Sequence, residues 1–304
     1  MRRPSGEQFE IAFGDQRVVV VEVGGGLRTY TVDGRDVVDG YGADEMATAG
    51  RGQLLIPWPN RLQDGSYEFA GRTHQVPLNE PARANAIHGL VRWASWRERE
   101  REPHRVVLMH ALHPQPGYPF SLELAVEYEL SASGLAIRTT ATNVGTTTCP
   151  YGSGAHPYLR VGAETVDDVV LRVPALTVLR SDDRGIPVGA VPVDGTEHDF
   201  RVARPIGATK LDHGFTDLER DEAGLAHVDL SAGNARLALW LDEAYPYVMV
   251  FTGDLPAINR GGLAVEPMTC PPNAFRSGES LVILEPGDSH TGTWGLAPTT
   301  GVRE

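Results

Sequence analysis

The sequence predicts an all-β protein, built as a large antiparallel β-sandwich. Three observations lead to this fold class. Apolar and polar residues alternate along many short segments, 34 Gly and 22 Pro punctuate the chain, and no window of a dozen residues carries an apolar stripe at helical spacing. Alternation places one face of a strand against a core, whereas Gly and Pro end strands in turns and interrupt helices.

The clearest strand covers residues 122–130. Its apolar residues Leu122, Leu124, Val126, Tyr128 and Leu130 share one face, and polar residues occupy most of the other. Turn formers separate this segment from similar ones, which we expect to be strands at Phe9–Phe13, Arg17–Val23, Arg105–Leu112, Leu135–Thr142, Ala235–Leu241, Tyr247–Thr252 and Leu281–Leu284.

We expect a single domain over residues 1–304, because the chain shows no internal repeat, low-complexity tract or linker. The range Arg180–His198 is expected to be a long connecting loop. With 41% hydrophobic and 22% charged residues the chain is typical of a globular protein. No apolar run reaches the roughly 20 residues that a membrane helix needs, so we expect no membrane association.

Charge and cysteine content restrict the partners. The 27 Lys and Arg against 40 Asp and Glu give a formal charge of −13, which would repel nucleic acid. Cys149 and Cys270 are too few for a disulfide framework or a zinc cluster, and no histidines have metal-ligand spacing, so no metal and no cofactor are expected. Because the start lacks the apolar stretch of a secretory signal, we expect a cytoplasmic location.

Two histidines and one glutamate are the strongest candidates for chemistry. His88 and His156 lie among small residues, and Glu266 lies in a Pro-rich segment. An imidazole with a reference pKa of about 6.5 and a carboxylate with one of about 4.3 supply an acid and a base. The alternatives are a turn histidine at 156 and a loop ion pair at 266. The apolar residues before Glu266 instead favour a strand end that faces a cleft.

Five segments, in order, resemble the aldose 1-epimerase (galactose mutarotase) family. They are residues 55–62 (LIPWPNRL), 85–90 (NAIHGL), 152–159 (GSGAHPYL), 211–215 (LDHGF) and 266–275 (EPMTCPPNAF). The resemblance implies a galactose mutarotase-like supersandwich with an open sugar cleft and no metal. It also implies that the protein interconverts the α and β anomers of a free hexose such as glucose or galactose.

The resemblance further implies roles for individual residues. His156 is expected to protonate the ring oxygen, while Glu266 removes the proton from the anomeric hydroxyl. Contacts to the sugar are expected from five other residues: Asn60, Arg61, His88, Tyr158 and Asp212. Ring opening requires acid and base on different sides of one carbon, which residues distant in the sequence can provide.

Other interpretations of the binding residues stay open. Asn60 and Arg61 could close a turn, and Asp212 could form an Asx turn. Many members of the family have a glutamine that contacts the sugar where this chain has Met249, and a thioether cannot donate a hydrogen bond. Trp58, Trp93 and Trp96 are aromatic candidates for stacking on a sugar, but tryptophan is equally common in sandwich cores.

Two further functions remain as alternatives. A hexose 6-phosphate 1-epimerase would need cations near the far end of the sugar, and Arg83, Arg92 and Arg97 are candidates. A sugar-binding or sensor protein without catalysis would have no need of the matched acid and base. In each case the partner is a small-molecule sugar, while the sequence leaves the oligomeric state and the natural sugar open.

Overall fold

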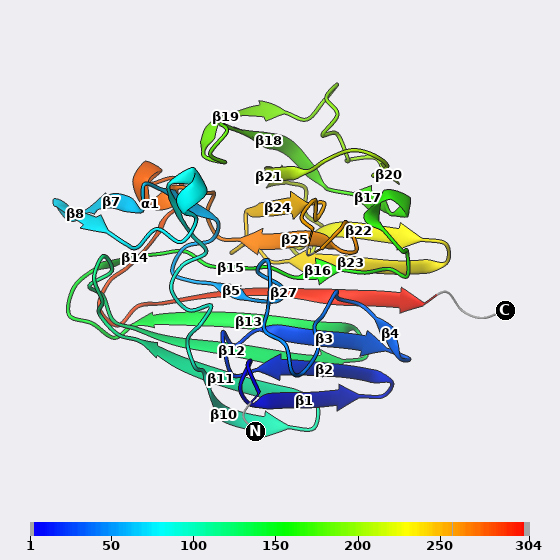
Figure 1. Cartoon of the computed structure of the whole chain (residues 1–304), viewed down its shortest axis with the longest axis horizontal. Coiled ribbons are helices and arrows are strands. Elements are labelled where there is room, and N and C mark those ends of the chain that lie inside the picture. The colour runs from blue at the N-terminus through cyan, green and yellow to red at the C-terminus, as the bar shows by residue number, and fades with distance from the viewer. Residues whose placement is uncertain (1–2, 257, 301–304) are drawn as a thin grey trace.

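A computed structural model describes residues 3–256 and 258–300, and these residues form mainly strands and connecting loops (Figure 1). The helical segments within this part are short. They are α1 (Ala274–Ser277) and the 3-10 turns η1 (Pro81–Arg83) and η2 (Val166–Asp168). The all-β prediction is therefore confirmed. No helix in the described ranges is long and apolar enough to cross a bilayer.

Two large antiparallel sheets dominate the fold. The first has nine strands in the order β10 (Arg97–Glu102), β11 (Arg105–Leu112), β12 (Leu122–Ser131), β13 (Gly134–Asn143), β27 (Ser289–Thr300), β23 (Ala235–Leu241), β22 (Ala226–Ala232), β17 (Val170–Arg172) and β20 (Arg204–Pro205). The second has eight, in the order β19 (Pro187–Pro192), β18 (Ala175–Ser181), β21 (Asp212–Leu218), β24 (Tyr247–Phe251), β25 (Leu263–Met268), β15 (Gly154–Ala155) and β5 (Leu54–Leu55), with β16 (Tyr158–Leu159) also paired to β25.

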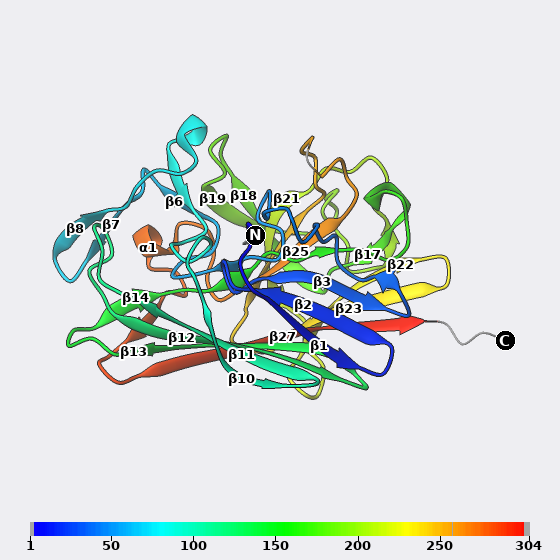
Figure 2. The same cartoon turned by 60° about the horizontal axis from the view of Figure 1, so that its bottom comes forward.

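Smaller sheets complete the molecule. A four-stranded sheet contains β1 (Gln8–Phe13), β2 (Gln16–Val21), β3 (Leu27–Val32) and β4 (Arg35–Asp36), and its β1 contacts β11 and β12. Three two-stranded sheets pair β14 (Cys149–Tyr151) with β26 (Val282–Leu284), β6 (Arg61–Gln63) with β9 (Asn85–Ile87), and β7 (Ser66–Phe69) with β8 (Arg72–Gln75). Figure 2 shows β10 to β13 along one side of the molecule and β18, β19 and β21 on the other.

The core lies between these sheets. On β12, alternate residues from Leu122 to Leu130 are buried, as the sequence pattern predicts. They pack in one contiguous cluster with residues of the eight-stranded sheet, such as Val248 and Val265, and of the four-stranded sheet, such as Phe9. Burying one such aliphatic side chain contributes about 1.5–3 kcal/mol, so the two layers hold each other in place.

The expectation of a loop over Arg180–His198 was wrong. β18 continues to Ser181, and the chain returns as β19 (Pro187–Pro192), which forms the edge of the eight-stranded sheet. Most β19 side chains are exposed or only partly buried, so the segment shows no alternation of apolar residues. Proline is tolerated on an edge strand because one side of the backbone has no strand partner.

Candidate active site

Glu266 lies in the interior of β25, and its side chain points away from the main core. Its neighbour Val265 belongs to that core, while Glu266 and Met249, which is opposite it on β24, lie on the other face. The expectation that Glu266 occupies a loop or strand end was therefore wrong. Pro267 fits inside the strand because the partner on one side is broken between β15 and β16.

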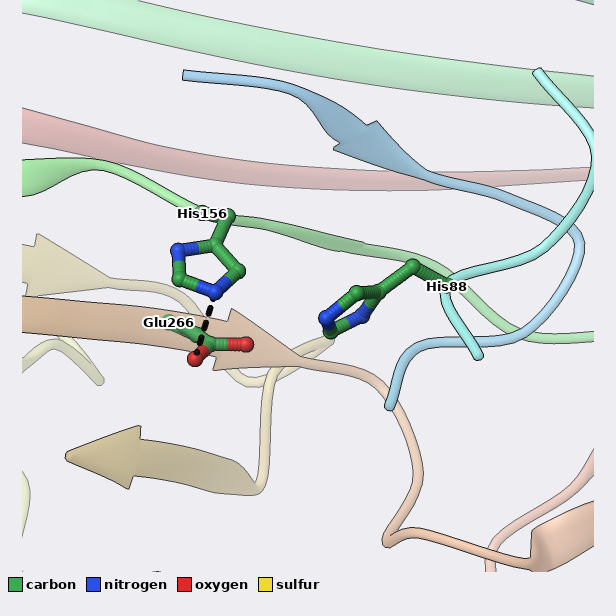
Figure 3. A group of neighbouring side chains, drawn as sticks. All are labelled: His88, His156 and Glu266. Carbon is green, nitrogen blue, oxygen red and sulfur yellow. Dashed lines mark ion pairs between the residues drawn. The ribbon is translucent and has the colours of Figure 1, made fainter. Parts of the chain in front are cut away.

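His156 occupies that break and lies opposite Glu266. Gly154 pairs with Met268 and Tyr158 pairs with Ala264, so the register places residue 156 across from residue 266. The Nε2 atom of His156 is 3.2 Å from Oε1 of Glu266 (Figure 3). The two residues predicted to act as acid and base thus contact each other directly.

His88 approaches the same point from the loop after β9. Its ring lies edge-on to that of His156, with 5.3 Å between the ring centres, and points towards the pair (Figure 3). The backbone N–H of Asn60 donates to Nδ1 of His88 at 3.2 Å. Burial and the positive charge on neighbouring residues hold the pKa of His88 well below its usual value. The ring is therefore neutral, with its proton on Nε2, and acts as a fixed donor.

All seven predicted site residues line one cleft of about 900 Å³. They reach it from β6, from β21, from β25, and from the segments around β9 and β16; they are Asn60, Arg61, His88, His156, Tyr158, Asp212 and Glu266. A drug-sized or smaller ligand fits a cleft of this volume.

Arg61 is fixed in the wall of the cleft by Glu80. Its Nε and Nη2 atoms donate to the carboxylate at 3.0 and 3.1 Å, and Asn85 donates to the same carboxylate at 3.0 Å. Burial alone would lower the pKa of Arg61, but the hydrogen bonds to Glu80 and the charge of Asp212 outweigh it and raise the pKa. Nη1 makes no hydrogen bond within the described part of the chain, so it is available to a ligand.

Tyr158 and Asn60 act largely on their neighbours. The ring of Tyr158 stacks on His156 with 5.0 Å between centres, and its hydroxyl donates to the carbonyl of Ala49 at 3.1 Å. The side-chain oxygen of Asn60 accepts from the backbone N–H of Arg61 at 2.9 Å. Both residues line the cleft, but these contacts also orient the histidine and the arginine beside them.

Sequence reasoning missed Glu80 and left Arg92 and Trp93 outside the predicted site. All three line the cleft. Trp93 is 59% exposed at the rim, whereas Trp58 and Trp96 are buried in the core. Arg92 has no carboxylate partner within the part of the chain that the structure describes, and burial lowers its pKa. No spacing in the sequence marks Glu80, because its role comes from Arg61, which is distant in the chain.

Burial sets the protonation state of the central pair. It lowers the pKa of His156, with a further contribution from Arg92. Burial also raises the pKa of Glu266 well above its usual value, and Asp212 adds to this effect while Arg61 opposes it. Both shifts disfavour an ion pair and favour the neutral forms of His156 and Glu266. The second oxygen of Glu266, Oε2, is buried with no partner among the described residues.

The same three side chains resemble a metal-binding set in composition. The ligand atoms of His88, His156 and Glu266 lie within 4.8 Å of one another. Ligation by Nε2 of His88 would need its lone pair, which would move the proton to Nδ1. That nitrogen faces the N–H of Asn60 and already accepts from it, so the backbone opposes this tautomer. The geometry thus favours proton transfer over metal binding.

The comparisons with known proteins agree with this fold. The family profile described as aldose 1-epimerase matches residues 7–296. The uncharacterized protein YihR of Escherichia coli K12 is 38% identical over 287 residues, covering 94% of this chain and 91% of that protein.

Solved structures also share the fold. A putative aldose 1-epimerase from Escherichia coli K12 has a TM-score of 0.84 at 20% identity, with 97% of this chain and 99% of that chain covered. Galactose 1-epimerase from Lactobacillus acidophilus NCFM has a TM-score of 0.82 at 22% identity, with 99% and 97% covered. The predicted galactose mutarotase-like supersandwich is thereby confirmed, and the profile match across nearly the whole sequence shows that the chain belongs to the aldose 1-epimerase family.

Proposed function

We propose that the protein is a cofactor-independent mutarotase that interconverts the α and β anomers of a free hexose such as glucose or galactose. The observation that carries this proposal is the 3.2 Å contact between Nε2 of His156 and Oε1 of Glu266 in the cleft. A purely sugar-binding protein has no need of two buried titratable groups that share one proton. An enzyme that moves a proton on and off a sugar does.

The reaction needs one proton to leave the anomeric hydroxyl and one to reach the ring oxygen. As the O–H electrons form the carbonyl, the bond between C1 and the ring oxygen breaks, and that oxygen takes a proton from the acid. The aldehyde then turns about the C1–C2 bond, and the reverse steps close the ring on its other face. No net proton is consumed, so a pair holding one proton suffices.

In this proposal His156 is the acid towards the ring oxygen and Glu266 is the base towards the anomeric hydroxyl. The proton that rests on Glu266 in the free site must first pass to His156. Arg61 lowers the pKa of Glu266, and sugar hydroxyls that donate to the carboxylate act in the same direction. In the reverse step the two residues exchange roles.

The other cleft residues hold the sugar. The Nε2–H of His88 and the free Nη1 of Arg61 donate to sugar oxygens, and the carboxylate of Asp212 accepts from hydroxyls. We propose that Asn60 and Tyr158 complete the set, in part through the neighbours that they orient. Because these residues hold the hydroxyls that are far from C1, the anomeric end of the sugar stays free to rotate.

The test is polarimetry on freshly dissolved α-glucose and α-galactose. The wild-type protein should speed relaxation, and Glu266→Gln should lose at least about 100-fold in kcat, the lower bound expected for a general acid or base. His227→Asn is the matched control, because His227 pairs with Asp221 outside the cleft. Relaxation by Glu266→Gln at the wild-type rate would refute the proposal. Sugar binding without acceleration by the wild type would instead indicate a sugar-binding protein.

A hexose 6-phosphate is the second candidate substrate. Arg92 is the observation that favours it, since it is a half-buried cation in the cleft with no carboxylate partner in the described ranges, and Arg83 lies in the same wall. Arg97 is exposed on the edge strand β10 and does not line the cleft. Comparing kcat/KM for glucose and glucose 6-phosphate, with Arg92→Ala as the variant, decides between the two.

A further inference from the structure

The turn between β18 and β19 is a closed and well-fixed structure. Oδ1 of Asp182 accepts from the backbone N–H groups of Arg184 and Ile186, both at 2.9 Å. The N–H of Gly185 donates to the carbonyl of Asp182, also at 2.9 Å, and Ile186 is buried. These contacts define the hairpin tip, residues 182–186, as a rigid unit rather than a loose loop.

Arg184 attaches this hairpin tip to the segment that carries part of the cleft wall. Its guanidinium donates to the carbonyls of Arg83 and Ala84 at 2.9 and 2.8 Å and to Asp64 at 2.7 Å. In return, the side-chain amide of Asn85 donates to the carbonyl of Arg184 at 2.9 Å. The same amide nitrogen donates to Glu80, which holds Arg61.

Gly185 contacts Arg61 itself. A β-carbon at residue 185 would lie 2.6 Å from Nη1 and 2.9 Å from Cζ of Arg61, closer than non-bonded atoms approach. The guanidinium cannot retreat freely, because Glu80 holds its Nε and Nη2 atoms. Only a residue without a side chain at this position allows Nη1 to stay where it is, in the cleft wall that Arg61 lines.

We propose that the hairpin tip is a positioning element for substrate binding, with Gly185 and Arg184 as positioning residues that fix the direction of the Arg61 Nη1 donor. The proposal rests on the proposed mutarotase function. The tip sets the direction of Nη1, whereas Glu80 keeps the charge of Arg61, which lowers the pKa of Glu266, in the cleft wall. It therefore acts on sugar affinity and not on proton transfer. It is a determinant of KM contributed by a strand pair at the edge of the sheet.

Gly185→Ala is the direct test, measured by the KM and kcat of mutarotation and by calorimetric sugar affinity. The methyl group displaces Nη1, so KM and the dissociation constant should both rise about tenfold, as expected for a lost hydrogen bond to a charged group, while kcat stays within about twofold. Gly195→Ala is the matched control. Gly195 also has a positive φ, +71° against +75°, but no atom lies near its added carbon.

Arg184→Ala tests the other attachment and keeps the inference testable if Gly185→Ala fails to fold. It should raise KM in the same way, whereas Arg201→Ala, which breaks ion pairs with Asp194 and Asp199 outside the cleft, should not. Unchanged KM in folded Gly185→Ala or Arg184→Ala, or a fall in kcat alone, would overturn the inference. Absence of wild-type mutarotation would instead refute the proposed function, and calorimetry would still report the effect on sugar affinity.

Discussion

Replacing Glu80 by glutamine perturbs the cleft wall without changing its shape. The carboxylate accepts hydrogen bonds from two nitrogens of Arg61, one of which, Nε, reaches both oxygens, and from Asn85. In Glu80→Gln an amide NH₂ takes the place of one oxygen and faces these donors, so at least one contact is lost. Arg61 then keeps its charge in a site where its side chain is only 10% exposed, with no carboxylate held against it.

The expected cost follows from these contacts. Hydrogen bonds to charged groups contribute about 1.5–3 kcal/mol, and removing one partner of a fully buried ion pair costs about 3–5 kcal/mol. The side chain of Glu80 is 22% exposed, so water offsets part of the loss. We expect the free energy of unfolding to fall by about 2–3 kcal/mol at pH 7.

Urea denaturation measures this change. Asp229→Asn is the control. The side chains of Arg172 and Asp229 are 35% and 47% exposed, and such a surface ion pair contributes less than about 1 kcal/mol.

The pH dependence of stability tests the same contact. Burial would raise the pKa of Glu80, but Arg61 and Asn85 outweigh this and lower it below 4.5. The stability that Glu80 contributes is therefore present above pH 4.5 and is lost as the pH falls through the lowered pKa.

Two results would refute this reasoning. One is a Glu80→Gln variant no less stable at pH 7 than Asp229→Asn. The other is a difference between wild type and Glu80→Gln that persists unchanged after Glu80 is protonated in acid. Either would mean that the contact with Arg61 does not stabilise the folded state.

Three further outcomes are expected. In the pH profile of kcat/KM for mutarotation, the loss at low pH reports a second proton on the pair and should lie below pH 6.5, because burial lowers the pKa of His156. The loss at high pH reports removal of the last proton and should lie above pH 4.5, because burial raises the pKa of Glu266. Dialysis against EDTA should leave the polarimetric rate unchanged, because the backbone opposes the tautomer of His88 that would bind a metal. Leu124→Ala, in the fully buried core, should lower the free energy of unfolding in urea by about 2–5 kcal/mol, and a loss below about 1 kcal/mol would contradict the assigned packing.

Most of the strands that the sequence predicts have one buried face. The range 122–130 alternates because one side of β12 faces the core and the other faces solvent. The same pattern does not reveal β19, because this strand lies at a sheet edge and has little buried surface. Glu266 was expected at a strand end because apolar residues precede it and prolines follow it, and only the broken neighbouring strand explains how Pro267 fits inside β25.

The site residues named in advance depend on the resemblance to a family, since neither His156 nor Glu266 is distinguished by spacing alone. The structure adds what depends on three-dimensional contact. Glu80 matters because its bridge to Asn85, the first residue of β9, brings it to Arg61. The neutral forms of His156 and Glu266 are favoured because both side chains are buried. The cytoplasmic location, the 1–304 domain boundary and the individual sugar contacts stay predictions.

The most direct test of a shared-proton pair is a kinetic double-mutant cycle of His156→Asn, Glu266→Gln and the double variant, followed by polarimetry on α-glucose. If the two residues work as one unit, the double variant should be no slower than the slower single variant, because either change alone already disables proton transfer. Losses that multiply, so that the double variant falls by the product of the two single effects, would show that the residues act independently and would contradict the account.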